Sequence, residues 1–310
     1  MKGVFKMEKK QVIILGSGPA GLTAAIYAKR AELDVLVLEK NTMSGGQVLN
    51  TYEVDNYPGL PGINGFDMGM KFREHADRLG VPFLSDEITE IERTKDGYVL
   101  RGNQGEYEGR ALIVATGATH RHLGLEREEE LTGRGVSYCA TCDGAFFRGR
   151  DVAVIGGGDV AVEDAIFLAR LCRKVYVVHR RDELRAAKSL QARLLSMENV
   201  EMVWNSVAKE LTGDDLVDGL IVADTKTKET RRLEVDGVFV AVGILPNSSL
   251  ALELADHDEG GYLRAGEDGV TSAPGLFVAG DVRTKPLRQI VTAVSDGANC
   301  ITSVERYLER

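Results

Sequence analysis

Apolar positions along this chain gather into short runs that end on glycine. The first run, Gln11 to Leu15, has the length of a buried strand and is followed at once by Gly16-Ser17-Gly18-Pro19-Ala20-Gly21. A helix-like stretch from Leu22 to Ala31 comes next, and a second strand, Val35 to Leu38, ends on Glu39. This order of strand, glycine turn, helix and strand predicts a Rossmann-like unit, in which backbone amides at a helix N-terminus hold a pyrophosphate.

The same order returns in the middle of the chain. A strand from Val152 to Ile155 leads into Gly156-Gly157-Gly158-Asp159-Val160-Ala161, a helix through Leu171 and a strand from Val175 to Val178. Two copies in one register, each with its strand and helix context, argue against coincidence. We therefore predict two nucleotide-binding units.

The two copies differ in the residue that follows the second strand. Counted equally far past the first glycine, Glu39 corresponds to His179, which is followed by Arg180 and Arg181. A carboxylate accepts hydrogen bonds from a ribose diol, whereas guanidinium groups bind a ribose 2′-phosphate. The second copy is therefore expected to prefer NADPH, with Arg185 reaching the same phosphate if a helical turn starts near Asp182. The alternative is a solvated run of charges.

The first copy fits NAD or FAD by spacing alone. Two further apolar strands end on small residues, Ala111 to Thr116 before Gly117 and Gly275 to Ala279 before Gly280-Asp281. Such strand ends bring small residues and one carboxylate near an extended cofactor, and Asp281 suits a ribityl hydroxyl of FAD. The alternative makes both glycines simple turn residues.

The order of these segments predicts a nested α/β fold of two Rossmann-like, three-layer ββα domains, one inserted in the other. We expect residues 1–117 and 247–310 to form a discontinuous FAD-binding domain, and residues 118–246 to form an NADPH-binding domain that carries the dithiol described next. Gly117 and Leu245-Pro246 are the predicted hinges.

A vicinal cysteine pair, Cys139 and Cys142, lies just before the second glycine motif. Two thiols at this spacing can close a small disulfide ring, and one of them commonly has a lowered pKa. Asp143 follows directly and can act as the acid for a departing thiolate if burial raises its pKa. A structural zinc site would need four ligands, and no second cysteine pair exists. Cys172 and Cys300 are expected to be small buried side chains.

Composition narrows the function classes. The 310 residues carry a formal charge of −9, which gives no basis for general nucleic-acid binding. No apolar run reaches the length of a membrane span, and the charged first ten residues lack the apolar core of a signal peptide. Four cysteines fit a reducing compartment, so we expect a cytoplasmic protein that binds neither nucleic acid nor membrane.

These motifs together resemble the bacterial low-molecular-weight thioredoxin reductases over nearly the whole chain. The most specific match is Cys139-Ala140-Thr141-Cys142-Asp143-Gly144, supported by Gly45-Gly46-Gln47, His179-Arg180-Arg181-Asp182 and Arg288-Gln289. The resemblance implies a homodimer with FAD in each subunit that uses NADPH to reduce the disulfide of thioredoxin.

The expected site residues follow from the motifs and the resemblance together. The redox pair is Cys139 and Cys142, with Asp143 as the acid, and no metal is expected. The expected FAD contacts are Gly16, Gly18, Pro19, Ala20, Gly21, Glu39, Lys40, Gly46, Gln47, Asn56, Ala115, Thr116, Gly117, Gly280, Asp281, Arg288, Gln289 and Ile290. The expected NADPH contacts are Gly156, Gly158, Asp159, Ala161, His179, Arg180, Arg181 and Arg185.

Two alternatives stay open at this stage. One is a related flavoprotein that reduces another small redoxin or draws electrons from a different donor such as ferredoxin, although Arg180 and Arg181 argue against ferredoxin. The other is a flavin-binding interaction protein whose dithiol is a regulatory switch. Reoxidation by thioredoxin after bleaching with NADPH separates an enzyme from a binder.

Overall fold

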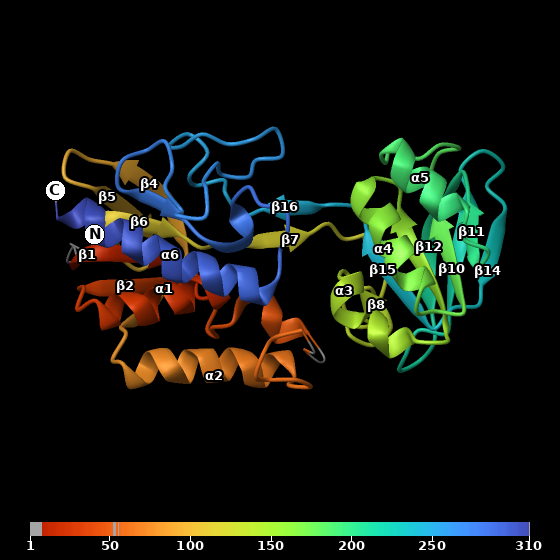
Figure 1. The fold of residues 1–310 in the computed structure, drawn as a ribbon, viewed down its shortest axis with the longest axis horizontal. Helices are drawn as coiled ribbons and strands as arrows, with labels where there is room; N and C mark the ends of the chain where they lie inside the picture. Colours follow the sequence, from red (N-terminus) through yellow and green to blue (C-terminus); the bar gives the residue numbers. More distant parts are fainter. Residues whose placement is uncertain (1–7, 52–53, 55, 310) are drawn as a thin grey trace. The chain divides into compact units, whose positions relative to one another are not determined.

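The computed structural model describes residues 8–51, 54 and 56–309, and these divide into two compact units. The first unit contains the chain up to Thr119 and again from Leu245 onward, and the second unit is His120–Ile244. In Figure 1 the first unit therefore carries both the red and the dark blue segments, and the second the green and cyan ones. Residues 1–7, which belong to the expected FAD-binding domain, lie outside the described residues.

The first unit is built on a seven-stranded sheet with β1 near its centre. Parallel strands pair in the order β3-β2-β1-β6, and the far edge of β6 is shared by β5, antiparallel along its first half, and β17, parallel along its second half. The strands are β1 (Glu8–Leu15), β2 (Val35–Glu39), β3 (Phe83–Ser85), β4 (Ile88–Arg93), β5 (Tyr98–Gly102), β6 (Glu106–Val114) and β17 (Leu276–Val278).

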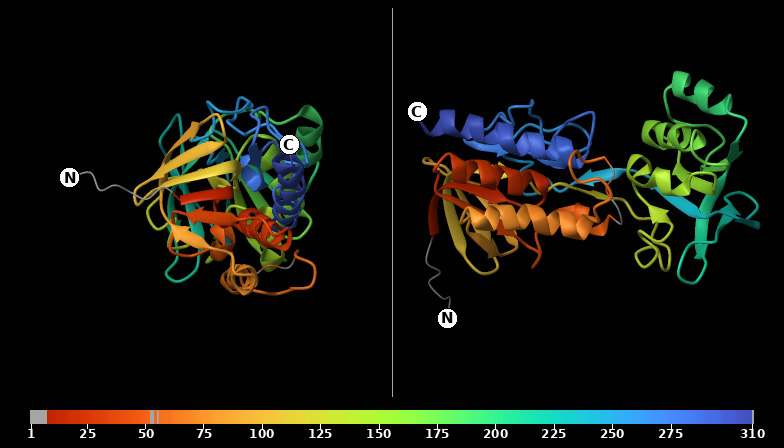
Figure 2. Two further views of the ribbon diagram at one scale, coloured as in Figure 1. Left: turned by 90° about the vertical axis from the view of Figure 1, so that its left-hand side faces the viewer. Right: turned by 60° about the horizontal axis from the view of Figure 1, so that its bottom comes forward.

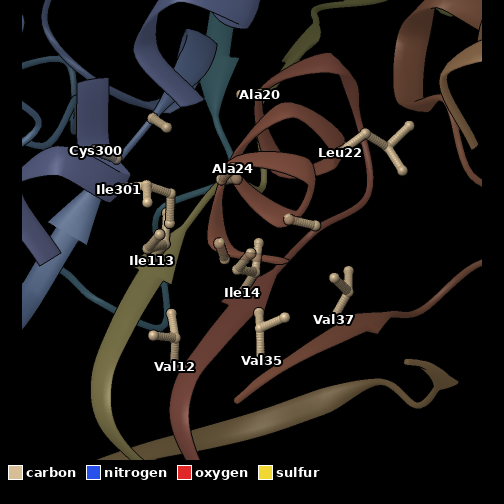
Figure 3. Close-up of a cluster of buried hydrophobic side chains, with 14 of the residues drawn as sticks. Val12, Ile14, Ala20, Leu22, Ala24, Val35, Val37, Ile113, Cys300 and Ile301 are labelled. Carbon is tan, nitrogen blue, oxygen red and sulfur yellow. The ribbon is translucent and has the colours of Figure 1, made fainter. Parts of the chain in front are cut away.

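Alternation along β1 assigns its side chains to two cores. Val12 and Ile14 pack against the helices, whereas Ile13 and Leu15 belong to the core on the opposite face of the sheet. Figure 3 shows the helix-side core, in which Val12, Ile14 and Ile113 of the sheet meet Ala24 and Ile301 of two helices. Each of these side chains is almost completely buried, so the glycine turn after β1 is anchored on both faces.

The helices of this unit are α1 (Pro19–Arg30), α2 (Gly65–Arg78) and α6 (Ile290–Leu308), with short 3-10 turns η1 (Gly46–Asn50) and η3 (Gly280–Val282). Helix α1 begins before the predicted Leu22 because Pro19 occupies its first position, where a missing N–H costs nothing. Helices α1 and α6 lie side by side (Figure 2, right). A Cβ on Gly297 of α6 would lie 2.2 Å from the carbonyl oxygen of Ala20, so only glycine allows this approach.

The second unit has three layers. Five parallel strands pair in the order β11-β10-β9-β15-β8, and β12, β13 and β14 form a separate antiparallel sheet. Val152 and Val154 of β9 pack against the helices, whereas Ala153 and Ile155 share a core with β12–β14 residues such as Leu220. The elements are β8 (Val136–Ser137), α3 (Ala140–Asp143), η2 (Gly144–Phe147), β9 (Asp151–Gly156), α4 (Asp159–Ala169), β10 (Lys174–Val178), α5 (Lys188–Leu195), β11 (Val200–Val203), β12 (Ser206–Thr212), β13 (Gly219–Asp224), β14 (Thr230–Leu233) and β15 (Gly237–Ala241).

Two short strands mark the junctions between the units. β7 (Ala118–His120) and β16 (Ile244–Pro246) pair with each other as a two-stranded sheet. Gly117, directly before β7, has φ +70°, a conformation that favours glycine. The α/β fold class with Rossmann-like parallel sheets is confirmed by this topology. Within the described residues no helix is both long and apolar enough to cross a bilayer.

Candidate active site

The first glycine turn is closed too tightly for any larger residue. Gly16 has φ +107°, and a Cβ there would lie 2.5 Å from the carbonyl oxygen of Ala115. A Cβ on Gly21 would lie 1.9 Å from the carbonyl oxygen of Gly16. Gly18 precedes α1 without a side-chain cap, so the first N–H groups of this helix point out of the turn. The turn thus offers the backbone donors that a pyrophosphate requires.

Glu39 turns back toward this loop. Its Oε2 accepts hydrogen bonds from the Ser17 backbone N–H and from the Ser17 hydroxyl, both at 2.8 Å, and its Oε1 accepts from the Asn41 N–H at 3.0 Å. A second loop closes over the turn, because the Gly45 N–H donates to the Ser17 carbonyl and Gly46, with φ +60°, lies against Gly18. The predicted ribose-binding acid therefore stands beside the predicted pyrophosphate loop.

Asp281 carries an unsatisfied oxygen. It follows Gly280, which has φ +80°, in the turn η3. Its Oδ1 is buried and has no hydrogen-bond partner among the described residues. Burial raises the pKa of Asp281, opposed by the positive charges of Lys285 and Arg288. A buried carboxylate oxygen without a donor fits a ligand hydroxyl, which is what the ribityl chain of FAD presents.

Sequence reasoning missed the ion cluster that holds Gly280, the residue before Asp281. Asp296 of α6 is buried, accepts a hydrogen bond from the Gly280 N–H at 2.9 Å, and pairs with Arg283 at 2.6 Å and Lys285 at 2.7 Å. These bonds fix the position of Gly280 and hence of the turn that carries Asp281. No local pattern signals this cluster, because a lone aspartate in an amphipathic helix reads as a surface residue.

The other predicted FAD contacts are distributed through the first unit. Asn56 donates to the Gln289 side chain at 2.9 Å, and the Arg288 guanidinium lies 4.0 Å from the centre of the Tyr262 ring. Thr116 and Asn247 exchange two hydrogen bonds, which tie the end of β6 to the returning chain. Lys40 and Gln47 are exposed, and Ile290 begins α6. Together with the glycine turn beside Glu39 and with Asp281, these residues fit FAD.

The second glycine turn has a different interior. Gly156 has φ +158°, and a Cβ there would lie 2.5 Å from the methyl group of Ala161. Gly158 precedes α4 without a side-chain cap and has open space around it. Asp159, the first residue of α4, accepts a hydrogen bond from the Ala187 N–H at 2.7 Å. The N-terminus of α4 is therefore open to an anion, as in the first copy.

The basic cluster splits into one buried and three exposed residues. The His179 ring packs on the backbone of Gly157, where a Cβ would lie 2.2 Å from it, and burial lowers the pKa of His179. Arg180, Arg181 and Arg185 are exposed. The expected helical turn near Asp182 is wrong, because the chain bends there and the first helix after it, α5, begins only at Lys188.

Arg185 reaches the glycine turn by another route. Its backbone N–H donates to the Gly157 carbonyl at 2.7 Å, so the residue is held beside the loop without a helix. Because His179 is kept neutral by burial, the positive charge at this strand end comes from the three arginines. The three arginines can therefore bind a phosphate, whereas the His179 ring packs on the loop.

The cysteine pair forms a disulfide at the start of α3. Cys139 and Cys142 are bonded, and their Cα atoms are 5.3 Å apart. Cys139 precedes the helix, and its carbonyl accepts hydrogen bonds from the N–H groups of Cys142 and Asp143. Both cysteines are half-buried, and Thr141 between them is exposed. The pair is thus accessible at one edge of a tight turn, as an exchange reaction requires.

Asp143 lies on the same turn as Cys142. Its Oδ2 accepts a hydrogen bond from the Ser137 hydroxyl at 2.6 Å, whereas its Oδ1 is buried and has no partner among the described residues. Burial raises the pKa of Asp143, and the Ser137 hydrogen bond opposes this. The carboxyl group therefore keeps its proton to a higher pH than an ordinary aspartate, which suits a proton donor.

The remaining cysteines are structural, as predicted. Cys172 and Cys300 are reduced and buried. Burial raises the pKa of Cys172 to about 11 and that of Cys300 to about 12, so neither is a thiolate at neutral pH. The exchangeable sulfur chemistry is confined to Cys139 and Cys142.

Two nucleotide-type units and one accessible dithiol define a nucleotide-dependent disulfide oxidoreductase, and comparisons with known proteins agree. The model of the pyridine nucleotide-disulphide oxidoreductase family matches residues 10–297. A thioredoxin reductase of Listeria monocytogenes is 46% identical over 96% of this chain and 93% of its own length, and that of Bacillus subtilis is 44% identical over 96% and 94%. The crystal structure of thioredoxin reductase from Streptococcus pyogenes matches with a TM-score of 0.93 at 44% identity, covering 97% of this chain and 98% of that chain.

The chain therefore belongs to the pyridine nucleotide-disulphide oxidoreductase family and, within it, to the thioredoxin reductases. FAD and NADPH are the cofactors of this group, in agreement with the two glycine turns. The predicted family, fold class and cofactors are confirmed.

Proposed function

We propose that this protein is an NADPH-dependent thioredoxin-disulfide reductase in which FAD links NADPH to the Cys139–Cys142 pair. The observation that carries this proposal is the disulfide itself, half-buried beside the protonatable Asp143 in a unit that also presents a glycine turn and three exposed arginines. When bound, FAD supplies an acceptor for the hydride of NADPH and a two-electron donor for a disulfide.

The first unit offers the groups that would hold FAD. The backbone donors of the Gly16–Gly21 turn suit the pyrophosphate, Glu39 suits the adenosine ribose, and the unpartnered Oδ1 of Asp281 suits a ribityl hydroxyl. We assign residues 1–117 and 247–310 to this FAD-binding role. The assignment rests on the chemistry of these three groups, each in the first unit.

The second unit offers the groups that would hold NADPH. The open N-terminus of α4 suits the pyrophosphate, and Arg180, Arg181 and Arg185 suit the 2′-phosphate that distinguishes NADPH from NADH. A neutral His179 packed on the loop fits this assignment because it brings no repelling carboxylate. We assign residues 118–246 to this role.

The thiol chemistry falls to three side chains. Two electrons break the Cys139–Cys142 bond, and Asp143 donates its proton to one of the two sulfurs, leaving a thiol and a thiolate. The thiolate attacks one sulfur of the thioredoxin disulfide, forming a mixed disulfide and expelling the other sulfur. The second enzyme thiol gives its proton to the expelled thioredoxin sulfur and attacks the mixed disulfide, which re-forms the Cys139–Cys142 bond. Thioredoxin leaves with two electrons and two protons, the second of which comes from water.

The proposal includes the partner and setting that the resemblance implies. Thioredoxin is the acceptor, the protein is a homodimer, and its location is cytoplasmic. Sedimentation velocity of the purified protein tests the dimer, and a monomer at micromolar concentration would contradict it.

A spectral titration tests the function. The purified protein is expected to show the visible absorption of bound flavin, which NADPH bleaches without oxygen and oxidised thioredoxin restores. Cys142→Ser should still be bleached by NADPH but should not turn over thioredoxin, whereas Cys172→Ser should do both, because its thiol is buried away from exchange. A colourless protein that retains no added FAD, or a Cys142→Ser variant with normal turnover, would refute the proposal.

A further inference from the structure

Ser137 joins the Asp143 carboxylate to the backbone of Cys139 through one hydroxyl group. It is the last residue of β8 and its side chain is buried. The hydroxyl donates to Oδ2 of Asp143 at 2.6 Å and accepts from the Cys139 backbone N–H at 3.1 Å. The carbonyl of Cys139 lies 3.3 Å from the same hydroxyl, a longer contact than that to the carboxylate. Cys139, Ser137 and Asp143 therefore form one hydrogen-bonded chain.

This chain decides which oxygen of Asp143 is available. A carboxyl group can turn about its bond to Cβ, and either oxygen can then be presented to a neighbour. Because Ser137 holds Oδ2, Oδ1 is the buried oxygen left without a partner among the described residues. An unpartnered buried oxygen costs free energy, and Oδ1 is therefore the oxygen of Asp143 that is free to bind or exchange a proton with another group.

Tyr138, the residue between Ser137 and Cys139, is held by a different set of side chains. The Tyr138 hydroxyl donates to Oε1 of Glu128 at 2.7 Å and contacts Nδ1 of His122 at 2.9 Å. Glu128 is buried and also accepts from the N–H groups of Leu123, Gly124 and Leu125. Tyr138 therefore anchors the chain before Cys139 without touching Asp143, which makes it a matched comparison for Ser137.

We propose that Ser137 is a positioning residue of the dithiol centre, which holds Asp143 by Oδ2 so that Oδ1 exchanges a proton with the sulfurs of the Cys139–Cys142 pair. This inference rests on the proposed function and deepens it. In the reductive direction two electrons break the sulfur–sulfur bond, the Oδ1 proton moves to one sulfur, and Asp143 regains a proton from water. Ser137 keeps its own proton throughout.

A purely structural role for Ser137 makes a different prediction. A hydroxyl that only caps the turn before Cys139 would, when removed, lower stability and slow every step equally at all pH values. A positioning role changes the pH dependence, because the hydroxyl favours the charged form of Asp143 and its loss raises the pKa of Asp143 further.

The test measures reduction of the Cys139–Cys142 disulfide in a single turnover, followed by the return of flavin absorbance after mixing with NADPH without oxygen, at a series of pH values. For Ser137→Ala we expect a rate about tenfold lower at neutral pH, from misorientation of the acid, and a limb attributed to Asp143 that moves to higher pH. Ser137→Thr keeps the hydroxyl and should restore the profile, and Tyr138→Phe should keep the wild-type profile. In an Asp143→Asn background, Ser137→Ala should have no further effect on the rate.

A second measurement separates this inference from the proposed function. Infrared difference titration of the protonated carboxyl band, assigned by its loss in Asp143→Asn, follows Asp143 in the oxidised protein without any electron donor. Ser137→Ala should move this band's midpoint to higher pH, and Tyr138→Phe should not. A midpoint that stays in place overturns the role of Ser137, even if thioredoxin is reduced normally. A shifted midpoint in a protein that does not reduce thioredoxin would instead refute only the function.

Discussion

The two glycine turns follow the same order of strand, turn and helix but place opposite chemistry at the end of the second strand. In the first unit Glu39 reaches back to the turn and accepts two hydrogen bonds from Ser17. In the second unit the His179 ring fills that place by packing on Gly157, and the charged residues that follow it are exposed. The same strand–turn–helix backbone therefore accommodates either a hydrogen-bonding carboxylate, Glu39, or a packed ring, His179, at the end of the second strand. Where the ring is present, the charged groups are the exposed arginines that follow it.

The two units also differ in how closely helix and turn approach. At the third glycine position of the first turn, any side chain at Gly21 would meet the Gly16 carbonyl. The second turn carries Ala161 at the equivalent place, with its methyl group fully buried. The first turn also gains the ion cluster of Asp296 from α6, at the returning end of the chain. The first unit is therefore the more tightly constrained of the two.

The largest expected effect comes from breaking the ion cluster of the first unit. Asp296→Asn leaves Arg283 and Lys285 buried without a full counter-charge and weakens the hold on Gly280, so we expect a loss of about 3 kcal/mol or more in stability. Urea unfolding followed by circular dichroism measures it, and flavin fluorescence after gel filtration measures the expected loss of FAD. The control is Glu309→Gln, which changes an exposed carboxylate just after the end of α6. It should change stability by less than about 0.5 kcal/mol.

A smaller effect distinguishes Gly21 of the first turn from Ala161 at the equivalent position of the second turn. Gly21→Ala forces the first turn apart, and we expect a cost of about 2 to 3 kcal/mol together with weaker FAD retention. The reciprocal change, Ala161→Gly, removes a buried methyl group without a clash and should cost about 1 kcal/mol. Thermal unfolding of both variants tests this asymmetry. Equal costs would mean that the two turns are packed alike.

The third prediction concerns the exposed arginines that follow His179 in the second unit. Replacing Arg180 and Arg181 by alanine removes two exposed guanidinium groups that we assign to the 2′-phosphate. The dissociation constant for NADPH should rise by about tenfold to a hundredfold, and that for NADH by less than about threefold. Quenching of the only tryptophan, Trp204, or calorimetry measures both. Equal losses for the two nucleotides would support the solvated charge run instead.

Local patterns predicted much of the fold and of the candidate site. The runs before Gly16 and Gly156 are strands, each followed by a helix that begins within the glycine motif. The Cys139–Cys142 pair closes a disulfide beside a carboxyl group whose pKa burial raises. These features depend on residues adjacent in sequence, where periodicity and turn chemistry act directly.

Features that depend on distant residues were not predictable in this way. The bond from Gly280 to Asp296 joins a turn to the middle of a helix, and the first strand of the junction, β7, pairs with β16 far along the chain. The helical turn considered near Asp182 does not form, and the Arg185 N–H is bound by the Gly157 carbonyl instead of by a local one. Tertiary hydrogen bonds overrode local propensity at each of these places.

The smallest expected effect probes the end of the second strand in the first unit. Glu39→Gln keeps one oxygen that can accept from Ser17 but loses the charge, so the turn should stay folded while its affinity for FAD falls by about threefold to tenfold. The apoprotein, titrated with FAD by flavin fluorescence, gives this affinity. NADPH binding in the second unit should be unchanged. Because the glutamine amide can still accept a hydrogen bond but carries no charge, a loss far above tenfold would mean that the charge of Glu39, and not its hydrogen bonds to Ser17, organises the first turn.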